Sequence, residues 1–315
     1  MITVETIAEV RAACERARGM GRTVGFVPTM GFFHEGHRSL MRAARARDDL
    51  VVVSLFVNPT QFAPTEDLTA YPRDLEGDAA AAASEGVDLL FAPSAAEMYP
   101  AGTPMRTTVH VDGLGDRLCG ASRPGHFDGV STVVAKLFSI VGPCRAYFGK
   151  KDAQQLAVVR RMALDLDLPV EVVGCPLVRE PDGLAMSSRN VYLEADERRA
   201  ATVLWHALHE AGAAALSGAR DAIDLRAALV GRIAAEPLVS LDYAEVVDAS
   251  TLEPITRIDG ETLVAVAARV GRARLIDNIT IVPDLEGLPD LDRVVVDEGL
   301  LTSSTRQQEL RCTAS

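Results

Sequence analysis

Residues 50–57 read LVVVSLFV, a run that is apolar on both faces apart from Ser54. A strand of this kind is buried on both sides, which is typical of parallel sheets covered by helices. The alternation of such runs with helical patterns predicts βαβ units, and so an α/β fold with a doubly wound, Rossmann-like parallel sheet. The other β-rich runs lie at residues 23–28, 87–93, 145–149 and 170–175.

The helices of this half are expected to begin near Gly36, Arg73, Gly129 and Asp152. Asp152 suits a helix N-terminus, because a carboxylate can accept hydrogen bonds from the free backbone N–H groups there. In a doubly wound sheet the ligand lies beyond the carboxyl ends of the strands. We therefore expect the functional residues in the segments that follow the predicted strands.

The pattern changes after about residue 178. Two helical stretches, at residues 195–218 and 224–236, are followed by strand-like runs at 241–248, 262–270 and 273–282. We predict a Rossmann-like domain over residues 1–178 and a smaller α+β domain over residues 179–282. Residues 283–315 contain turn formers, isolated charges and little periodicity, which predicts a flexible tail.

Charge and cysteine usage restrict the class of protein. The 315 residues carry a formal net charge of -12 and no basic run, so we expect no nucleic-acid partner. No segment approaches the roughly 18 consecutive apolar residues that span a bilayer, and no signal peptide begins the chain, so we expect a cytoplasmic protein without a membrane partner. Scattered cysteines without a C-x-x-C pair predict reduced, structural thiols. They are Cys14, Cys119, Cys144, Cys175 and Cys312.

Residues 27–41, VPTMGFFHEGHRSLM, place two histidines three residues apart where a strand gives way to a helix. Gly31 and Gly36 allow a tight turn, and the start of the helix offers unpaired N–H groups to an anion such as phosphate. His34 and His37 would face the same way on a helical turn. A structural metal ion would need further ligands, which no nearby cysteine or histidine supplies. Two packed histidines bonded to carbonyl groups are the other alternative.

The same residues carry a family resemblance. PTMGFFHEGH resembles the HIGH-type signature of the nucleotidyltransferase superfamily, and more narrowly the pantothenate synthetase (pantoate–β-alanine ligase) family. Further motifs of that family follow in order, and the resemblance spans about residues 1–282. They are SLFVNPTQF at 54–62, YPRD at 71–74, RPGHFDGVSTVVAKLF at 123–138, YFGKKDAQQL at 147–156 and REPDGLAMSSRNVYL at 179–193.

The resemblance implies a two-step reaction of three small-molecule substrates. Pantoate attacks the α-phosphorus of ATP to give pantoyl-adenylate and pyrophosphate, and β-alanine then displaces AMP to give pantothenate. It also implies Mg2+ and a homodimer. Two alternatives stay open: a transferase that adenylates another small carboxylate, and a nucleotide-binding module without catalysis. The pantoate-binding residues of the family are matched by Asn58, Gln61 and Gln155, which favours a pantoate–β-alanine ligase over a transferase for another carboxylate.

The resemblance also implies roles for individual residues. His37 would be a catalytic proton donor or charge stabiliser, together with His34, Lys151 and Arg189, because the first step accumulates negative charge on phosphate. The smaller domain would close over the site as a lid that excludes water. The residues implied to bind ATP are Met30, Gly31, His34, His37, Gly149, Lys150, Lys151, Asp152, Val178, Met186, Ser187, Ser188 and Arg189.

Pantoate calls for amide groups set in an apolar wall, here Asn58, Gln61 and Gln155. The wall would comprise Pro28, Phe56 and Phe62, while Tyr71, Arg123 and His126 are candidates for a lid or for dimer contacts. Asp78 is the carboxylate expected to bind Mg2+ beside the phosphates. The chain departs from the usual family pattern at Lys150, which is commonly Glu, at Ala153, and at Phe32 and Phe33.

Overall fold

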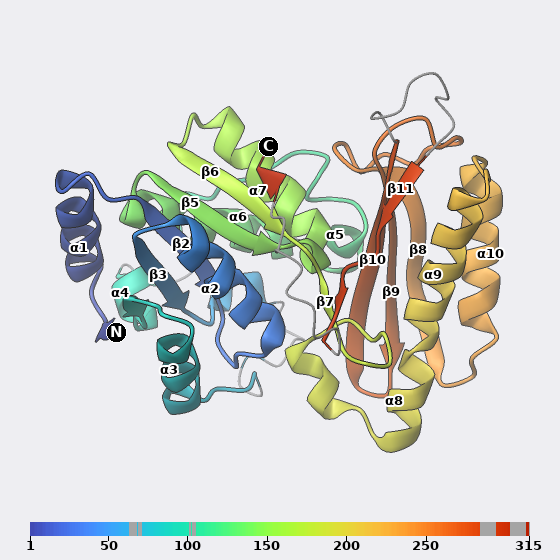
Figure 1. Ribbon diagram of the computed structural model, residues 1–315, viewed down its shortest axis with the longest axis horizontal. Coiled ribbons are helices and arrows are strands. Elements are labelled where there is room, and N and C mark those ends of the chain that lie inside the picture. Colours follow the sequence, from blue (N-terminus) through green and yellow to red (C-terminus); the bar gives the residue numbers. More distant parts are fainter. Residues whose placement is uncertain are drawn as a thin grey trace.

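A computed structural model of the chain describes residues 1–62, 68, 71–100, 102, 105–283, 294–302 and 313–314. Figure 1 shows an α/β region that contains the N-terminus and, beside it, an antiparallel sheet with helices on its outer face. This arrangement confirms the predicted fold class. Within the described part of the chain, no helix is long and apolar enough to cross a membrane.

The larger sheet contains six parallel strands in the order β1-β4-β3-β2-β5-β6, with β13 (Thr313–Ala314) antiparallel on the β6 edge. The chain moves outward from β2 in both directions, which is the doubly wound pattern. Five of the strands match the predicted runs within a few residues, whereas β1 was not predicted. The bounds are β1 Ile2–Val4, β2 Val24–Thr29, β3 Leu50–Leu55, β4 Leu89–Phe91, β5 Cys144–Gly149 and β6 Val170–Cys175.

Helices cover both faces of this sheet. On β3, Val52 packs into the cluster that contains residues of α1, α6 and α7, whereas its neighbours Val51 and Val53 pack with α2 and α3. Alternate residues thus enter different cores, which explains why the strand is apolar throughout. The helices are α1 Ile7–Gly19, α2 Glu35–Arg47, α3 Leu75–Ser84, α4 Ala95–Met98, α5 Cys119–Ser122, α6 His126–Val141 and α7 Ala153–Asp165.

The second sheet is antiparallel, in the order β11-β10-β9-β8. Its apolar face packs against α8, α9 and α10 in a separate core. The strands are β8 Val239–Asp248, β9 Thr262–Val270, β10 Ala273–Pro283 and β11 Val294–Asp297, and the helices are α8 Ala195–Ala201, α9 Val203–Leu216 and α10 Ala222–Ala234.

A third, two-stranded sheet pairs β7 (Val178–Arg179) with β12 (Leu300–Leu301) in parallel. The three strands described after Pro283 therefore belong to three different sheets. The sequence did not predict these strands: β12 and β13 pair with β7 and β6, which lie far away in the sequence and leave no periodicity to detect. The rest of the predicted flexible tail lies outside the described residues.

Candidate functional site

The predicted motifs meet at the carboxyl ends of three adjacent strands. β2 lies between β3 and β5, and it is where the strand order reverses. Met30 follows β2, Asn58 follows β3, and Lys150 follows β5. This is the position at which doubly wound sheets bind ligands.

Asp78 fixes the turn that leads from β2 to the histidines. Gly31 has a φ of 87° and Phe32 a φ of 55°, both in the left-handed region. The buried Asp78 carboxylate accepts hydrogen bonds from the backbone N–H groups of Phe32, at 2.7 Å, and of Phe33, at 2.6 Å. A Cβ on Gly31 would lie 2.9 Å from Asp78 Oδ2, so the turn needs glycine there. Asp78 thus has a structural task that its sequence context did not reveal.

The two histidines form a close pair at the start of α2. His34 is the N-cap residue, its ring centroid lies 4.1 Å from that of His37, and its backbone N–H donates to His37 Nδ1 at 3.4 Å. The buried Nδ1 atom of His34 has no hydrogen-bond partner among the described residues. Since Nδ1 of His37 is an acceptor, a neutral His37 carries its proton on Nε2.

Burial keeps both imidazoles neutral. It lowers the pKa of His34 from 6.5 to about 4, with the Lys151 ammonium adding to the shift and Asp152 opposing it. Burial also lowers the pKa of His37 well below its ordinary value, with further contributions from His34 and Lys151. The pair therefore offers N–H and lone-pair groups, not permanent positive charge, in the ligand-free protein.

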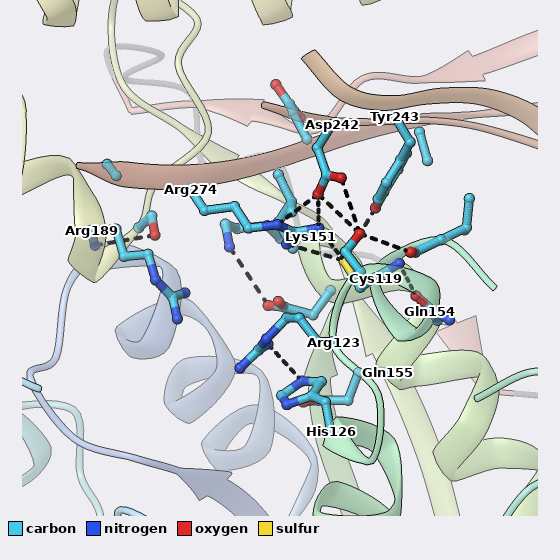
Figure 2. A pocket seen from close by; sticks show the side chains of 18 of the residues that line it. Cys119, Arg123, His126, Lys151, Gln154, Gln155, Arg189, Asp242, Tyr243 and Arg274 are labelled. Carbon is cyan, nitrogen blue, oxygen red and sulfur yellow. Dashed lines mark hydrogen bonds and ion pairs between the residues drawn. The ribbon is translucent and has the colours of Figure 1, made fainter. Parts of the chain in front are cut away.

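A cavity of about 880 Å³ lies between the two larger sheets. Figure 2 shows Lys151, Arg123 and Arg189 entering one space from three separate segments of the chain. His34 and His37 are not part of its lining, but a Cβ on Gly36, between them, would lie 4.0 Å from Cβ of Met186, which directly precedes the lining residue Ser187. The predicted residues that line it are Phe62, Tyr71, Arg123, His126, Lys151, Asp152, Gln155, Ser187, Ser188 and Arg189.

The segment of Met186 to Arg189 approaches the histidine turn. The Met186 N–H donates to the Val178 carbonyl at 2.9 Å, and Met186 Cβ lies 4.0 Å from where a Cβ on Gly36 would stand. Ser187 caps a 3-10 helix, η3 (Ser188–Tyr192), by accepting the Arg189 N–H at 3.3 Å. The predicted phosphate-facing groups of this loop therefore reach the same region as the turn after β2.

Lys151 belongs to the 3-10 helix η2 (Lys150–Asp152), which connects Gly149 at the end of β5 to α7. Asp152 occupies the predicted N-cap position, although its side chain makes no capping hydrogen bond. Lys150, predicted to bind ATP, does not line the cavity: its Nζ donates to Asp297 Oδ2 at 2.8 Å.

Asn58, which was predicted to bind pantoate, is held by hydrogen bonds within the protein. Its Nδ2 donates to the carbonyl of Gly129 at 3.1 Å and to Oε1 of Gln61 at 3.2 Å, and its Oδ1 accepts the hydroxyl groups of Tyr99 at 2.6 Å and Thr60 at 3.0 Å. With these four contacts Asn58 has no free group for a substrate. It instead orients Gln61.

Gln61 lies in η1 (Pro59–Gln61) and connects this network to the turn after β2, because its Nε2 lies 2.9 Å from Met30 Sδ. The backbone carbonyl of Gln61 accepts a hydrogen bond from His126 Nδ1 at 2.8 Å. A Cβ on Gly129 would lie 2.4 Å from the Thr60 carbonyl oxygen, so only glycine lets α6 approach this segment.

The roles of Asp277, Asn278 and the buried Arg179 were not predicted from the sequence. Arg179 NH1 contacts Asp277 Oδ2 at 2.7 Å, both side chains are 1% exposed, and the guanidinium stacks on Trp205 at 4.0 Å. Asn278 Nδ2 donates to the carbonyls of Lys150, at 3.1 Å, and Lys151, at 2.8 Å. Two adjacent polar residues within the apolar run ARLIDNITIV were the available signal.

The metal alternative for the histidine pair gains no support. Among the residues that the structure describes, one group of three His, Cys, Asp or Glu side chains is close enough to share a metal ion. It comprises His110, Asp112 and Asp116. All three are exposed, and none lines the cavity. Among the described residues, no third His, Cys, Asp or Glu side chain lies close enough to His34 and His37 to share a metal ion with them.

Comparison with known proteins shows the family to which the chain belongs. The model of the family described as pantoate-beta-alanine ligase matches residues 2–280. The chain belongs to that family. Pantothenate synthetase of Pelotomaculum thermopropionicum is 56% identical over 278 residues, which are 88% of this chain and 98% of the relative. That of Heliobacterium modesticaldum is 57% identical over 281 residues, 89% of this chain and 99% of the relative.

Solved structures agree with this assignment. The crystal structure of pantothenate synthetase from Thermus thermophilus has a TM-score of 0.83 and 51% identity, covering 88% of this chain and 98% of that one. A pantoate-beta-alanine ligase from Francisella tularensis, complexed with beta-gamma ATP and beta-alanine, has a TM-score of 0.72 and 33% identity over 88% of this chain and 97% of that one. The family predicted from the sequence is confirmed, and the chain is a ligase.

Proposed function

We propose that this chain condenses (R)-pantoate with β-alanine at the expense of ATP, giving (R)-pantothenate, AMP and diphosphate through a pantoyl-adenylate. The observation that carries the proposal is the cavity that Lys151, Ser187 and Arg189 line, close to the histidine turn. Family membership at more than 50% identity supports the same reaction.

The first step transfers an adenylyl group and develops negative charge on the α-phosphoryl oxygens and on departing pyrophosphate. Fixed cations and N–H donors stabilise such charge best when water is excluded. Lys151 and Arg189 supply the cations in this proposal, and Ser187, Ser188 and the neutral His37 supply hydrogen bonds. A bound triphosphate would raise the pKa values of His34 and His37, because an anion favours the imidazolium form. Proton donation by His37 would then follow phosphate binding.

Pantoate would lie against the amide of Gln61 and the side chain of Gln155. Asn58, which was predicted to bind the substrate itself, would instead hold the Gln61 amide in one orientation through its hydrogen bond to Gln61 Oε1. The carboxylate of pantoate would then point toward the α-phosphorus of ATP at the carboxyl ends of β2 and β5, near Lys151.

Magnesium would be held chiefly by the phosphates of ATP, since Mg2+ keeps several waters and takes few protein ligands. The proposal for Asp78 as one of these ligands meets an objection, because both of its oxygens already accept backbone N–H groups. We therefore propose Asp78 as a residue that positions the histidine turn.

Residues 1–178 and 179–282 would move as two domains, with the cavity between them closing on the adenylate. The cavity is lined by residues of both regions, among them Lys151 and Arg274, which supports this proposal. A structure with bound ATP and pantoate in which the two regions stay apart would contradict it. We also propose a homodimer, which light scattering of the purified protein would test by its mass.

The experiment for the function measures pyrophosphate and AMP from purified protein with ATP and Mg2+, first with pantoate and then with β-alanine added. We expect pyrophosphate in at most enzyme-stoichiometric amount with pantoate alone, and continuous AMP release only with both. His37→Asn should lower the turnover number at least about a hundredfold, the scale of a lost donor to transition-state charge. ATP binding without turnover of any kind would instead support the nucleotide-binding module.

A further inference from the structure

The segment of residues 294–302, called here the C-terminal segment, lies beyond the family match, which ends at residue 280. The two relatives are aligned over 98% and 99% of their own lengths, but over only 88% and 89% of this chain. They therefore have no counterpart for most of the chain after that match. Figure 1 shows β11 of this segment alongside β10, with β7 at the boundary between the two larger sheets.

The first contact of the C-terminal segment is the ion pair of Asp297 with Lys150, at 2.8 Å. The two side chains are 34% and 24% exposed, so water screens the pair only in part. Lys150 directly precedes Lys151, and Asn278 already holds both of their carbonyl groups. η2 is thus held from two strands. Asn278 of β10 bonds to its backbone carbonyls, and Asp297 of β11 pairs with the side chain of its first residue, Lys150.

The second contact is the pairing of β12 with β7. The Leu300 N–H donates to the Leu177 carbonyl at 2.7 Å, and the Thr302 N–H donates to the Arg179 carbonyl at 3.0 Å. On the opposite edge of β7, the carbonyl of Val178 accepts a hydrogen bond from the N–H of Met186. β7 therefore lies between the C-terminal segment and the loop that carries Ser187 to Arg189.

Gly299 makes this pairing possible. Its φ is +85°, and a Cβ there would lie 2.4 Å from the carbonyl oxygen of Leu177. The neighbouring Glu298 anchors the segment in the second sheet and its helices: its carbonyl accepts Arg179 Nε, and its Oε1 lies 2.9 Å from Nδ1 of His209 on α9. Glu298 thus anchors the segment between its contact with η2, made by Asp297, and its contact with β7, made by Leu300 and Thr302.

We propose that the C-terminal segment positions the ATP site, with Asp297 and Lys150 as positioning residues that act through η2 and with β12 acting through β7. Neither Lys150 nor Asp297 lines the cavity, so their effect on ATP passes through Lys151 and through the Ser187 to Arg189 loop. This inference rests on the proposed function, since it assigns ATP to that cavity.

The test uses the full chain and reverses the charges of the pair. Asp297→Lys places two ammonium groups together, Lys150→Glu places two carboxylates together, and the double variant restores an ion pair in the opposite sense. Glu210→Lys is the matched control, because Glu210 pairs with Arg232 at 3.1 Å between α9 and α10, and neither residue lines the cavity. Binding of ATP by calorimetry, the KM for ATP, kcat and the thermal midpoint are measured for each.

We expect each single variant to weaken ATP binding about fivefold, the scale of a partly exposed ion pair, and the double variant to recover to within about twofold of the wild type. Glu210→Lys should bind ATP as the wild type does. Unchanged ATP affinity in both single variants would overturn the inference, as would a loss of thermal stability alone or a double variant as weak as the singles. Absence of AMP formation by the wild type would refute the proposed function, whereas calorimetry would still decide the role of the segment.

Discussion

Replacing Asp78 by asparagine distinguishes its structural role from a metal-binding role. The Asp78 carboxylate is 3% exposed and accepts two short backbone hydrogen bonds from Phe32 and Phe33. Hydrogen bonds to a charged group contribute about 1.5–3 kcal/mol each. Asparagine keeps one acceptor but turns an NH2 group toward the second N–H. We therefore expect a loss of about 2–3 kcal/mol, reduced from the full sum because burial also penalises the carboxylate and raises its pKa.

The assay is thermal unfolding in buffer without metal or nucleotide. A loss of this size corresponds to a fall in midpoint of about 3–5 °C, because the unfolding entropy, at about 2.1 cal/mol/K per residue, grows with chain length. Glu76→Gln is the matched control: Glu76 lies in the same first turn of α3 but is exposed. An Asp78→Asn protein that unfolds at the wild-type temperature, and whose lost activity returns at high Mg2+, would refute the structural role and restore Asp78 as a metal ligand.

Variants of Asn58, Asn278 and His34 test the contacts that hold the site together. Asn58→Ala leaves buried partners unsatisfied, so it should cost about 2–4 kcal/mol of stability in denaturant unfolding and raise the KM for pantoate; an unchanged KM would separate Asn58 from Gln61. Asn278→Ala releases the carbonyls of Lys150 and Lys151 and should raise the KM for ATP several-fold more than the KM for β-alanine; equal effects on both would point to a general loss of structure. The lowered pKa of His34 means that the folded protein binds fewer protons than the unfolded chain, so its contribution to stability is complete above about pH 6.5 and is lost as the pH falls toward 4. Unfolding free energies of wild type and His34→Gln, measured from pH 7 to pH 4, should therefore converge by up to about 3 kcal/mol, and parallel curves would contradict the shift.

Local patterns were enough to predict the doubly wound sheet. Val51, Val52 and Val53 alternate between two helix-covered cores, and that double burial is visible in the sequence as an uninterrupted apolar run. The turn glycine Gly31 and the capping position of His34 are also local features, so the start of α2 was predicted correctly.

The contacts of Asn58 and Lys150 could not be predicted in this way. Asn58 was assigned to substrate because its residue type suits pantoate, but its partners Tyr99 and Gly129 are 41 and 71 residues away. Lys150 stands out in the sequence as a departure within a nucleotide-binding motif. In the structure it pairs with Asp297 of β11, which lies 147 residues later in the chain. Pairings at such separations leave no periodic signal in the chain, so only the tertiary structure reveals which polar groups are already satisfied.

The exchange of labelled pyrophosphate into ATP is the most direct test of a reaction that passes through pantoyl-adenylate. The first step is reversible and needs no amine, so the proposed mechanism predicts exchange that requires pantoate and Mg2+ and proceeds without β-alanine. Exchange should fall sharply in Lys151→Met, which removes the cation proposed to face the phosphates. Exchange that appears only when β-alanine is present, or none at all while pantothenate still forms, would contradict an adenylate intermediate at this site.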